Sequence, residues 1–188
     1  MNWSEAKDRP LNEAWNVLEM QRFFAAVQGG VALPGRKPGF CIVAALRHIP
    51  IREQTCEIHV LAEYESPRIG DLLRHCRALR AQYAIDPSRP LRWVGDSQNK
   101  AALQVVRNLN AERDRVGRDS LHLGAARILD MQEAAYQYML SLLDECLKPD
   151  RKSLYLRGSR VAEYMETIQA EDVPDLAFGD FPAIEALA

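Results

Sequence analysis

The hydrophobic and polar positions along the chain change period several times, and each change predicts a new element. Near the N-terminus three apolar runs predict strands at Arg22–Val27, Phe40–Leu46 and Thr55–Glu63. The residues Gln28-Gly29-Gly30 are expected to close the first strand. Short connections join the three runs, which favours an antiparallel meander.

The third run carries a clear two-residue alternation. Its apolar residues alternate with Glu57 and His59, so we expect one buried face and one solvent-facing side. The period then changes to that of a helix over Pro67–Tyr83, with apolar residues three and four apart. Ser66 is the expected N-cap of this helix and Pro67 its first residue.

The next apolar run, Leu91–Val94, predicts a buried strand that ends at Gly95-Asp96. Ser97 can cap a following helix over Asn99–Ala111. An acid at the carboxyl end of a strand in an open α/β sheet lies at the crevice where such sheets bind ligands. The alternative is that Asp96 serves only as a turn and helix-start residue, because Asp is common there.

Weaker patterns complete the chain. They predict a strand at Ser120–Gly124, a helix at Asp130–Leu147, a short strand at Leu154–Leu156 and a helix at Ser159–Gln169. The order of elements predicts an α/β fold in which helices flank a mixed five-stranded sheet. Three strands of this sheet are antiparallel and two are parallel.

The domain organisation follows from the same patterns. We expect residues 1–20 to form a lead-in or linker with a short helix at Asn12–Met20, and residues 21–188 to form one domain. The amphipathic pattern of Phe181–Ala188 stops without a capping residue, so we expect a chain truncated at its C-terminus.

Composition excludes several classes of protein. The formal net charge of −2 excludes a strongly basic surface overall, although a local basic face remains open. The four cysteines form no CxxC motif or Cys/His cluster, so we expect neither a structural zinc site nor a disulfide framework. No signal peptide and no apolar run of membrane-spanning length is present, which predicts a cytoplasmic protein without a membrane partner.

Three stretches of the chain carry a family resemblance. They are Arg22–Gly30 followed by Gly39–Val43, then Trp93-Val-Gly-Asp96, and finally Gly179–Leu187. In this order and spacing the chain resembles the ribonuclease H-like fold. Within that superfamily it is most similar to the nuclease domain of the large terminase subunit of tailed bacteriophages. No Walker-type GxxxxGK[ST] motif is present, so the ATPase half of a terminase is absent from this sequence.

The resemblance implies two-metal hydrolysis of a phosphodiester. Two Mg²⁺ or Mn²⁺ ions would activate a water and stabilise the leaving oxygen, which requires several clustered carboxylates. Asp96 matches the second acid of the family and Asp180 the third, so both are expected as metal ligands and catalytic residues. Helix capping is the alternative role for Asp180, and a solvated helix face is the alternative for Glu185, an auxiliary ligand candidate.

The first acid of the family is missing, because Gln28 occupies its expected position. An amide offers an oxygen but cannot replace the negative charge that bridges two ions. A neighbouring acid of the third strand could replace it, with Glu57, Glu63 and Glu65 as candidates.

Basic residues provide the DNA-binding candidates. Lys100 and Arg107 share one face of the helix after Asp96, where they could contact phosphates or only be solvated. A wider basic excess comprises Arg68, Arg74, Arg77, Arg80, Arg89 and Arg92. His122 is expected to be a structural histidine rather than a base.

Two functions follow from these expectations. The first is a terminase-like, metal-dependent endonuclease that cuts phage or prophage DNA during packaging, impaired by Gln28. Its partners would be double-stranded DNA and a separate packaging ATPase, portal or small terminase subunit. The alternative is a catalytically inactive ribonuclease H-like DNA-binding or assembly module, such as a prophage remnant. Another nuclease of the superfamily, such as a resolvase or transposase core, is a third reading.

Overall fold

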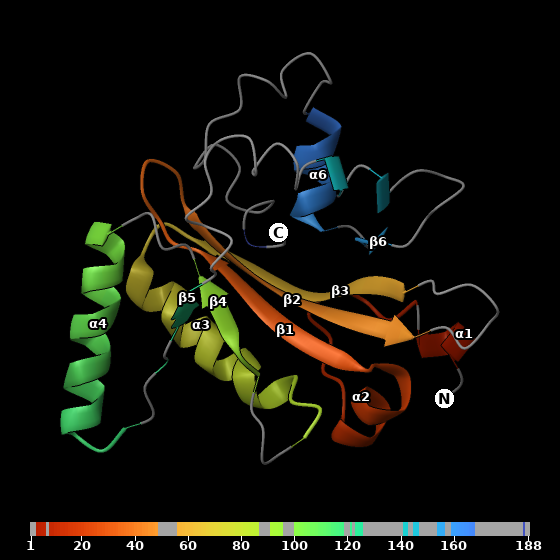
Figure 1. Cartoon of the computed structure of the whole chain (residues 1–188), viewed down its shortest axis with the longest axis horizontal. Helices are drawn as coiled ribbons and strands as arrows, with labels where there is room; N and C mark the ends of the chain where they lie inside the picture. Colours follow the sequence, from red (N-terminus) through yellow and green to blue (C-terminus); the bar gives the residue numbers. More distant parts are fainter. Residues whose placement is uncertain are drawn as a thin grey trace.

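The protein is built around a six-stranded mixed sheet, as seen in a computed structural model (Figure 1). The structure describes residues 3–6, 8–48, 56–86, 91–95, 100–118, 121, 123–125, 141–142, 145–146, 154–156, 159–167 and 186. The strand order is β5-β4-β1-β2-β3-β6. The strands are β1 Ala26–Ala32, β2 Gly39–His48, β3 Cys56–Ser66, β4 Trp93–Gly95, β5 Leu123–Ala125 and β6 Leu154–Tyr155.

The mixed α/β sheet expected from the sequence is confirmed. Strands β1, β2 and β3 pair antiparallel, while β4 pairs parallel with β1 and β5 pairs parallel with β4. The short run at residues 154–156 adds β6, which pairs parallel with β3 at the other edge. The described sheet therefore has one strand more than the five that we predicted.

Helices cover both faces of this sheet. The described helices are α1 Trp3–Ala6, α2 Val17–Phe23, α3 Ile69–Gln82, α4 Lys100–Arg115 and α6 Arg160–Thr167. In Figure 1, α3 and α4 lie on one side of the sheet and α6 on the other. A hydrophobic core cluster lies on the α3 side, where Leu72, Leu73 and Cys76 of α3 meet Cys41 and Val43 of β2.

The first strand begins later than the sequence pattern indicated. The predicted strand Arg22–Val27 is wrong, because Arg22 and Phe23 are the last two residues of α2. A capping box explains the helix. The Asn16 side chain accepts from the Glu19 N–H, and the Glu19 carboxylate accepts from the Asn16 N–H. The strand β1 then runs from Ala26 through the glycines that were expected to end it.

The start of α3 also differs from its prediction. Ser66 and Pro67 precede the helix, and Arg68 is its N-cap without a side-chain capping bond. The Ser66 hydroxyl instead accepts a hydrogen bond of 3.1 Å from the Arg68 N–H in the turn before the helix. The body of the helix is as predicted, since Leu72, Cys76 and Leu79 fill its buried face.

The N-terminal segment, expected as a lead-in, contributes to the main core. Ala6, Trp15, Met20 and Phe24 are all buried in the same cluster as α3. The predicted helix at Asp130–Leu147 and the terminal helix at 181–188 lie mostly outside the described residues. Among the described residues no helix is long and apolar enough to cross a membrane.

Candidate functional site

The expected metal site depends on how β1 and β4 lie beside each other. Their parallel register pairs Gly29 with Trp93, Gly30 with Val94, and Val31 with Gly95. Gln28 therefore lies three residues before the last described pair, which is about 10 Å along a strand. Its side chain is exposed, and across the sheet it pairs with Ala44 of β2. The expectation that Gln28 ends the first strand is wrong, because β1 continues to Ala32.

Strand β1 has no charged side chain along its whole length. Its sequence is Ala-Val-Gln-Gly-Gly-Val-Ala, so no carboxylate stands anywhere in the strand. A dication site needs clustered anionic oxygens, and β1 supplies at most the amide oxygen of Gln28. Among the residues that the structure describes, no three His, Cys, Asp or Glu side chains gather so that they could hold a metal ion.

Gly30 shows that a late segment of the chain reaches β1. A Cβ atom built on Gly30 would lie 1.6 Å from the backbone oxygen of Ala186. Only glycine permits so close an approach of two backbones. Ala186 is itself buried, and Gly30 pairs with Val94 in the sheet. Ala186, a residue of one stretch that carries the family resemblance, thus contacts β1, which carries another.

The acids proposed as ligands are not among the residues that the structure describes. Asp96 directly follows the last residue of β4 in the sequence, and Asp180 and Glu185 belong to the stretch around Ala186. Their side chains, and those of Arg89 and His122, lie outside the described residues. Their roles as ligands therefore stay predictions.

Glu57, the first candidate to replace the missing acid, lies on the other face of the sheet from Gln28. Gln28 pairs with Ala44, whereas Glu57 pairs with Arg47, and neighbouring residues of β2 alternate between the two faces. The Glu57 carboxylate forms an ion pair of 2.9 Å with Arg47 and lies 3.0 Å from His59 Nε2. Burial raises the pKa of Glu57, but these two contacts outweigh it and hold the pKa below its ordinary value.

Glu63 and Glu65, the other two candidates to replace the missing acid, are bound to residues at the start of α6. Glu63 accepts hydrogen bonds from the Arg160 N–H at 2.9 Å and from the Ser159 hydroxyl at 2.5 Å. Glu65 forms an ion pair with the Arg160 side chain. A carboxylate at a helix N-terminus satisfies N–H groups that have no partner within the helix. In this arrangement Glu63 and Glu65 attach α6 to β3 and are not available to a site at β1.

His59 belongs to a buried aromatic cluster that the sequence pattern did not indicate. Its side chain is 1% exposed, although the alternation placed it on the solvent side of β3. Tyr155 of β6 stacks on the His59 ring at 4.5 Å, and Trp3 of α1 meets it edge-on at 5.0 Å. Arg47 lies over the Trp3 ring at 3.8 Å. The covering residues come from the two ends of the chain, so local periodicity could not identify them.

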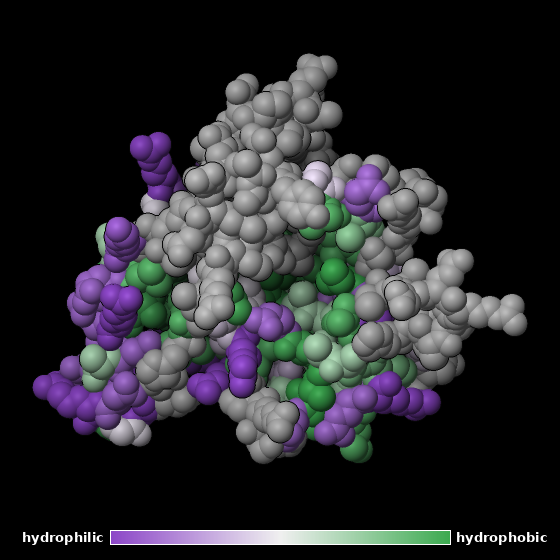
Figure 2. All heavy atoms as spheres, viewed as in Figure 1, coloured by the Kyte–Doolittle hydropathy of each residue, from purple (hydrophilic) through white to green (hydrophobic). Residues whose placement is uncertain are grey.

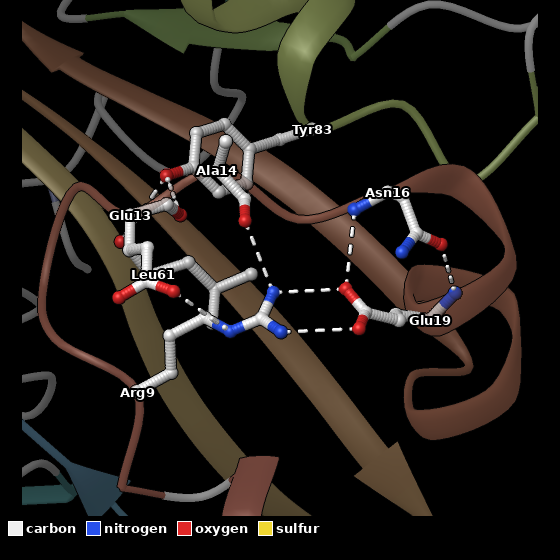
Figure 3. Close-up of polar contacts among 7 residues, drawn as sticks. All are labelled: Arg9, Glu13, Ala14, Asn16, Glu19, Leu61 and Tyr83. Carbon is white, nitrogen blue, oxygen red and sulfur yellow. Dashed lines mark hydrogen bonds and ion pairs between the residues drawn. The ribbon is translucent and has the colours of Figure 1, made fainter. Parts of the chain in front are cut away.

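Arg9 forms a second network that the sequence pattern missed (Figure 3). Its guanidinium makes two parallel bonds to the Glu19 carboxylate, at 2.9 and 3.1 Å, and donates to the Ala14 carbonyl at 3.0 Å. It also lies over the Trp15 ring, 4.2 Å from the centroid. The hydrogen bond from Arg9 holds the pKa of Glu19 below its ordinary value. This network ties residues 9–19 together and is structural.

The same segment is joined to the sheet at a bulge of β3. The register of β2 and β3 shifts between Val43 and Ala44, which leaves Leu61 without a β2 partner. The Leu61 carbonyl instead accepts from the Asn12 N–H at 2.9 Å. The Tyr83 hydroxyl donates to the Glu13 carbonyl at 3.0 Å and lies 3.5 Å from the same Leu61 oxygen. Burial raises the pKa of Tyr83 to about 12, so its hydroxyl remains a donor at neutral pH.

Lys100 and Arg107, the DNA-binding candidates, are exposed on α4. The buried residues of this helix are Ala102, Val106 and Asn110, and the two cations lie about 100–120° round the helix from the centre of that buried stripe. The sequence pattern had placed both on one helix face, and they are seven residues apart.

Comparison with known proteins found no similar protein. No family model matches the chain, and neither the curated proteins nor the solved structures searched contain a match.

Proposed function

We propose that this chain is a ribonuclease H-like module that binds double-stranded DNA without cutting it. Within that class, the nuclease domain of the phage terminase large subunit is the type that it resembles. The observation that carries the proposal is the combination of this strand arrangement with a β1 strand that has no acid.

The order of the strands supports the class. Read from β3, the sheet has the order β3-β2-β1-β4-β5 with β6 beside β3, and the fold that we propose has its five strands in the order 3-2-1-4-5. Contact between Gly30 and Ala186 also supports it, because the resemblance requires a late segment to meet β1 and β4.

The absence of cleavage follows from electrostatics. Two dications close together need negative ligands between them, and β1 offers none. The acids of β3 do not compensate, since Glu57 lies on the opposite face and Glu63 and Glu65 hold α6. A metal pair would have to depend on Asp96 and Asp180 without an anionic bridge between them.

The distribution of charge supports DNA as the partner. Residues 68–82 and 100–118, which contain α3 and α4, include nine Lys or Arg and only three Asp or Glu. The formal net charge of the whole chain is −2, so the remaining residues carry a net charge of −8. Such a separation of charge is typical of proteins that bind a polyanion.

The metal-dependent endonuclease is the second candidate, and the position of Asp96 directly after β4 favours it. An assay of plasmid relaxation in the presence of Mn²⁺ distinguishes this endonuclease from the non-cutting module. The variants are the native chain, Gln28→Asp, and Gln28→Asp combined with Asp96→Ala, each checked for folding by circular dichroism.

We expect all three proteins to bind the plasmid and none to cut it. Cleavage by the native chain would contradict the proposal in favour of the endonuclease, and an additional Asp96→Ala variant would test whether that activity depends on Asp96. Cleavage by Gln28→Asp alone, lost on Asp96→Ala, would identify a nuclease centre that lacks one ligand.

A further inference from the structure

The charges of α3 and α4 identify where DNA would be bound. We infer that the outer side of these two helices is a docking surface for the phosphate backbone of duplex DNA. This inference rests on the proposed function and assigns its partner to a surface away from the carboxyl end of β1.

Three cations of α4 lie outside its buried face, with Lys100 and Arg107 on one flank and Arg115 about 80° farther round the helix. They are Lys100, Arg107 and Arg115, and all three are exposed. Successive members are seven and eight residues apart, which is about 10 and 12 Å along the helix axis. Lys100 and Arg107 lie within about 20° of each other round the helix, so their separation along one flank is close to the width of a DNA groove and suits phosphates of both strands. Figure 2 shows hydrophilic residues gathered over α4 at the left of the molecule.

The neighbouring helix α3 adds exposed cations. α3 contacts α4, and Arg68 and Arg74 of the α3 region are exposed. Arg74 pairs with Asp71 at 2.6 Å, and Arg115 pairs with Glu112 at 2.8 Å. Exposed pairs of this kind contribute little to stability, so a phosphate can replace the carboxylate at small cost.

Two of these cations form ion pairs within their own helix. Arg74 pairs with Asp71 and Arg115 pairs with Glu112, each three residues away. The sheet side of α4 is held by Ala102, Val106 and the buried Asn110 instead. Substitution of Lys100 or Arg107 should therefore leave the fold intact.

The test is fluorescence anisotropy of a labelled 20-base-pair duplex with the full chain, titrated at several salt concentrations. The variants are Arg107→Glu and the double variant Lys100→Glu with Arg107→Glu. Arg22→Glu is the matched control, because Arg22 is exposed on α2, which lies apart from α4 in Figure 1, and gives the same charge change. Alanine versions of the α4 variants control for repulsion and for folding.

We expect Arg107→Glu to weaken binding several-fold and the double variant to weaken it at least tenfold, with Arg22→Glu within twofold of the native chain. Each lost phosphate contact should lower the slope of log K against log salt by about 0.9. Polyglutamate at equal charge should not displace the duplex.

The outcomes separate this inference from the proposed function. Native-like binding by the α4 variants would overturn the docking surface while leaving DNA binding in place. No duplex binding by the native chain would overturn both. Displacement by polyglutamate as effective as by unlabelled duplex would overturn the assignment to DNA and point to an acidic protein.

Discussion

Asn110 is the buried polar residue that joins α4 to the chain leading into β5. Its amide donates to the Leu121 carbonyl at 2.5 Å and accepts from the Leu121 N–H at 3.0 Å. Replacement by alanine would leave both backbone groups buried without these partners. We expect Asn110→Ala to lower the free energy of unfolding by roughly 1–3 kcal/mol, measured by urea denaturation.

Asn108 gives the control for this prediction. It is exposed on the same helix and accepts from Gln104 at 3.0 Å. Asn108→Ala should change the stability by less than about 0.5 kcal/mol. Equal losses from both variants would contradict a specific role for the Asn110 amide.

Glu57 makes the stability depend on pH in the acid range. Because its pKa is lower in the folded protein than in the unfolded chain, the ionised carboxylate favours folding. This contribution is fully present above the ordinary Glu pKa of about 4.3 and is lost as the pH falls through the folded value. We expect Glu57→Gln to cost about 1–3 kcal/mol at pH 7 and much less near pH 3.

The measurement is the melting temperature between pH 3 and 7 for the native chain, Glu57→Gln and Glu112→Gln. Glu112 pairs with Arg115 on the surface, where its side chain is 59% exposed, so its substitution should have little effect. A Glu57→Gln penalty that stays constant across this range would show that the ion pair is not its source.

At the scale of elements, Gly30 determines whether the late segment can rest on β1. An added Cβ would meet the Ala186 carbonyl at 1.6 Å, so the backbone of one segment must move. We expect Gly30→Ala to lower stability by about 1–3 kcal/mol and to increase hydrogen exchange in the peptide that contains Ala186.

Gly70 is the matched control. Nothing lies within 4 Å of a Cβ built there, and the residue is exposed in α3. Gly70→Ala should raise stability by about 0.5–1 kcal/mol, because alanine loses less backbone entropy in a helix. Unchanged exchange at Ala186 in Gly30→Ala would mean that the contact is dispensable.

The long amphipathic and alternating patterns predicted most described elements. The helix over Ile69–Gln82 and the strands within Gly39–His48 and Cys56–Ser66 were found close to their predicted positions. The start of β1 was missed because Phe23 and Phe24 look like strand residues. The capping box of Asn16 and Glu19 overrides that preference and keeps Phe23 helical.

The candidate site was less predictable, since it depends on register. Sequence spacing placed Gln28 at a strand end, whereas the pairing of Val31 with Gly95 shows that β1 continues beyond it. Glu63 accepts hydrogen bonds from Ser159 and Arg160, which are almost a hundred positions away in the sequence. No local pattern reports such contacts.

At the scale of the whole molecule, the N-terminal segment belongs to the fold. Trp15 and Met20 are buried in the main core, and Asn12 completes the hydrogen bonding of the β3 bulge at Leu61. A chain lacking residues 1–20 would expose this core and leave the Leu61 carbonyl without the Asn12 donor. We expect it to show no cooperative thermal transition, as measured by circular dichroism.

Arg9→Ala is the milder form of the same test. It removes the bonds to Glu19 and Ala14 but keeps the buried aromatic residues, so we expect a lower melting temperature with cooperativity retained. A truncated chain that melts like the full one would restore the view of residues 1–20 as a lead-in.

The pairing of β3 with β6 affects how the protein is made. Ile58 pairs with Leu154, so one edge of the central sheet is completed by a strand that the ribosome produces 96 residues later. At ordinary rates of synthesis that interval is roughly 5–20 s. Throughout it the hydrogen-bonding edge of β3 is open to other nascent chains. Slow translation of this chain should therefore favour aggregation, and a chaperone that covers strand edges should increase its soluble yield.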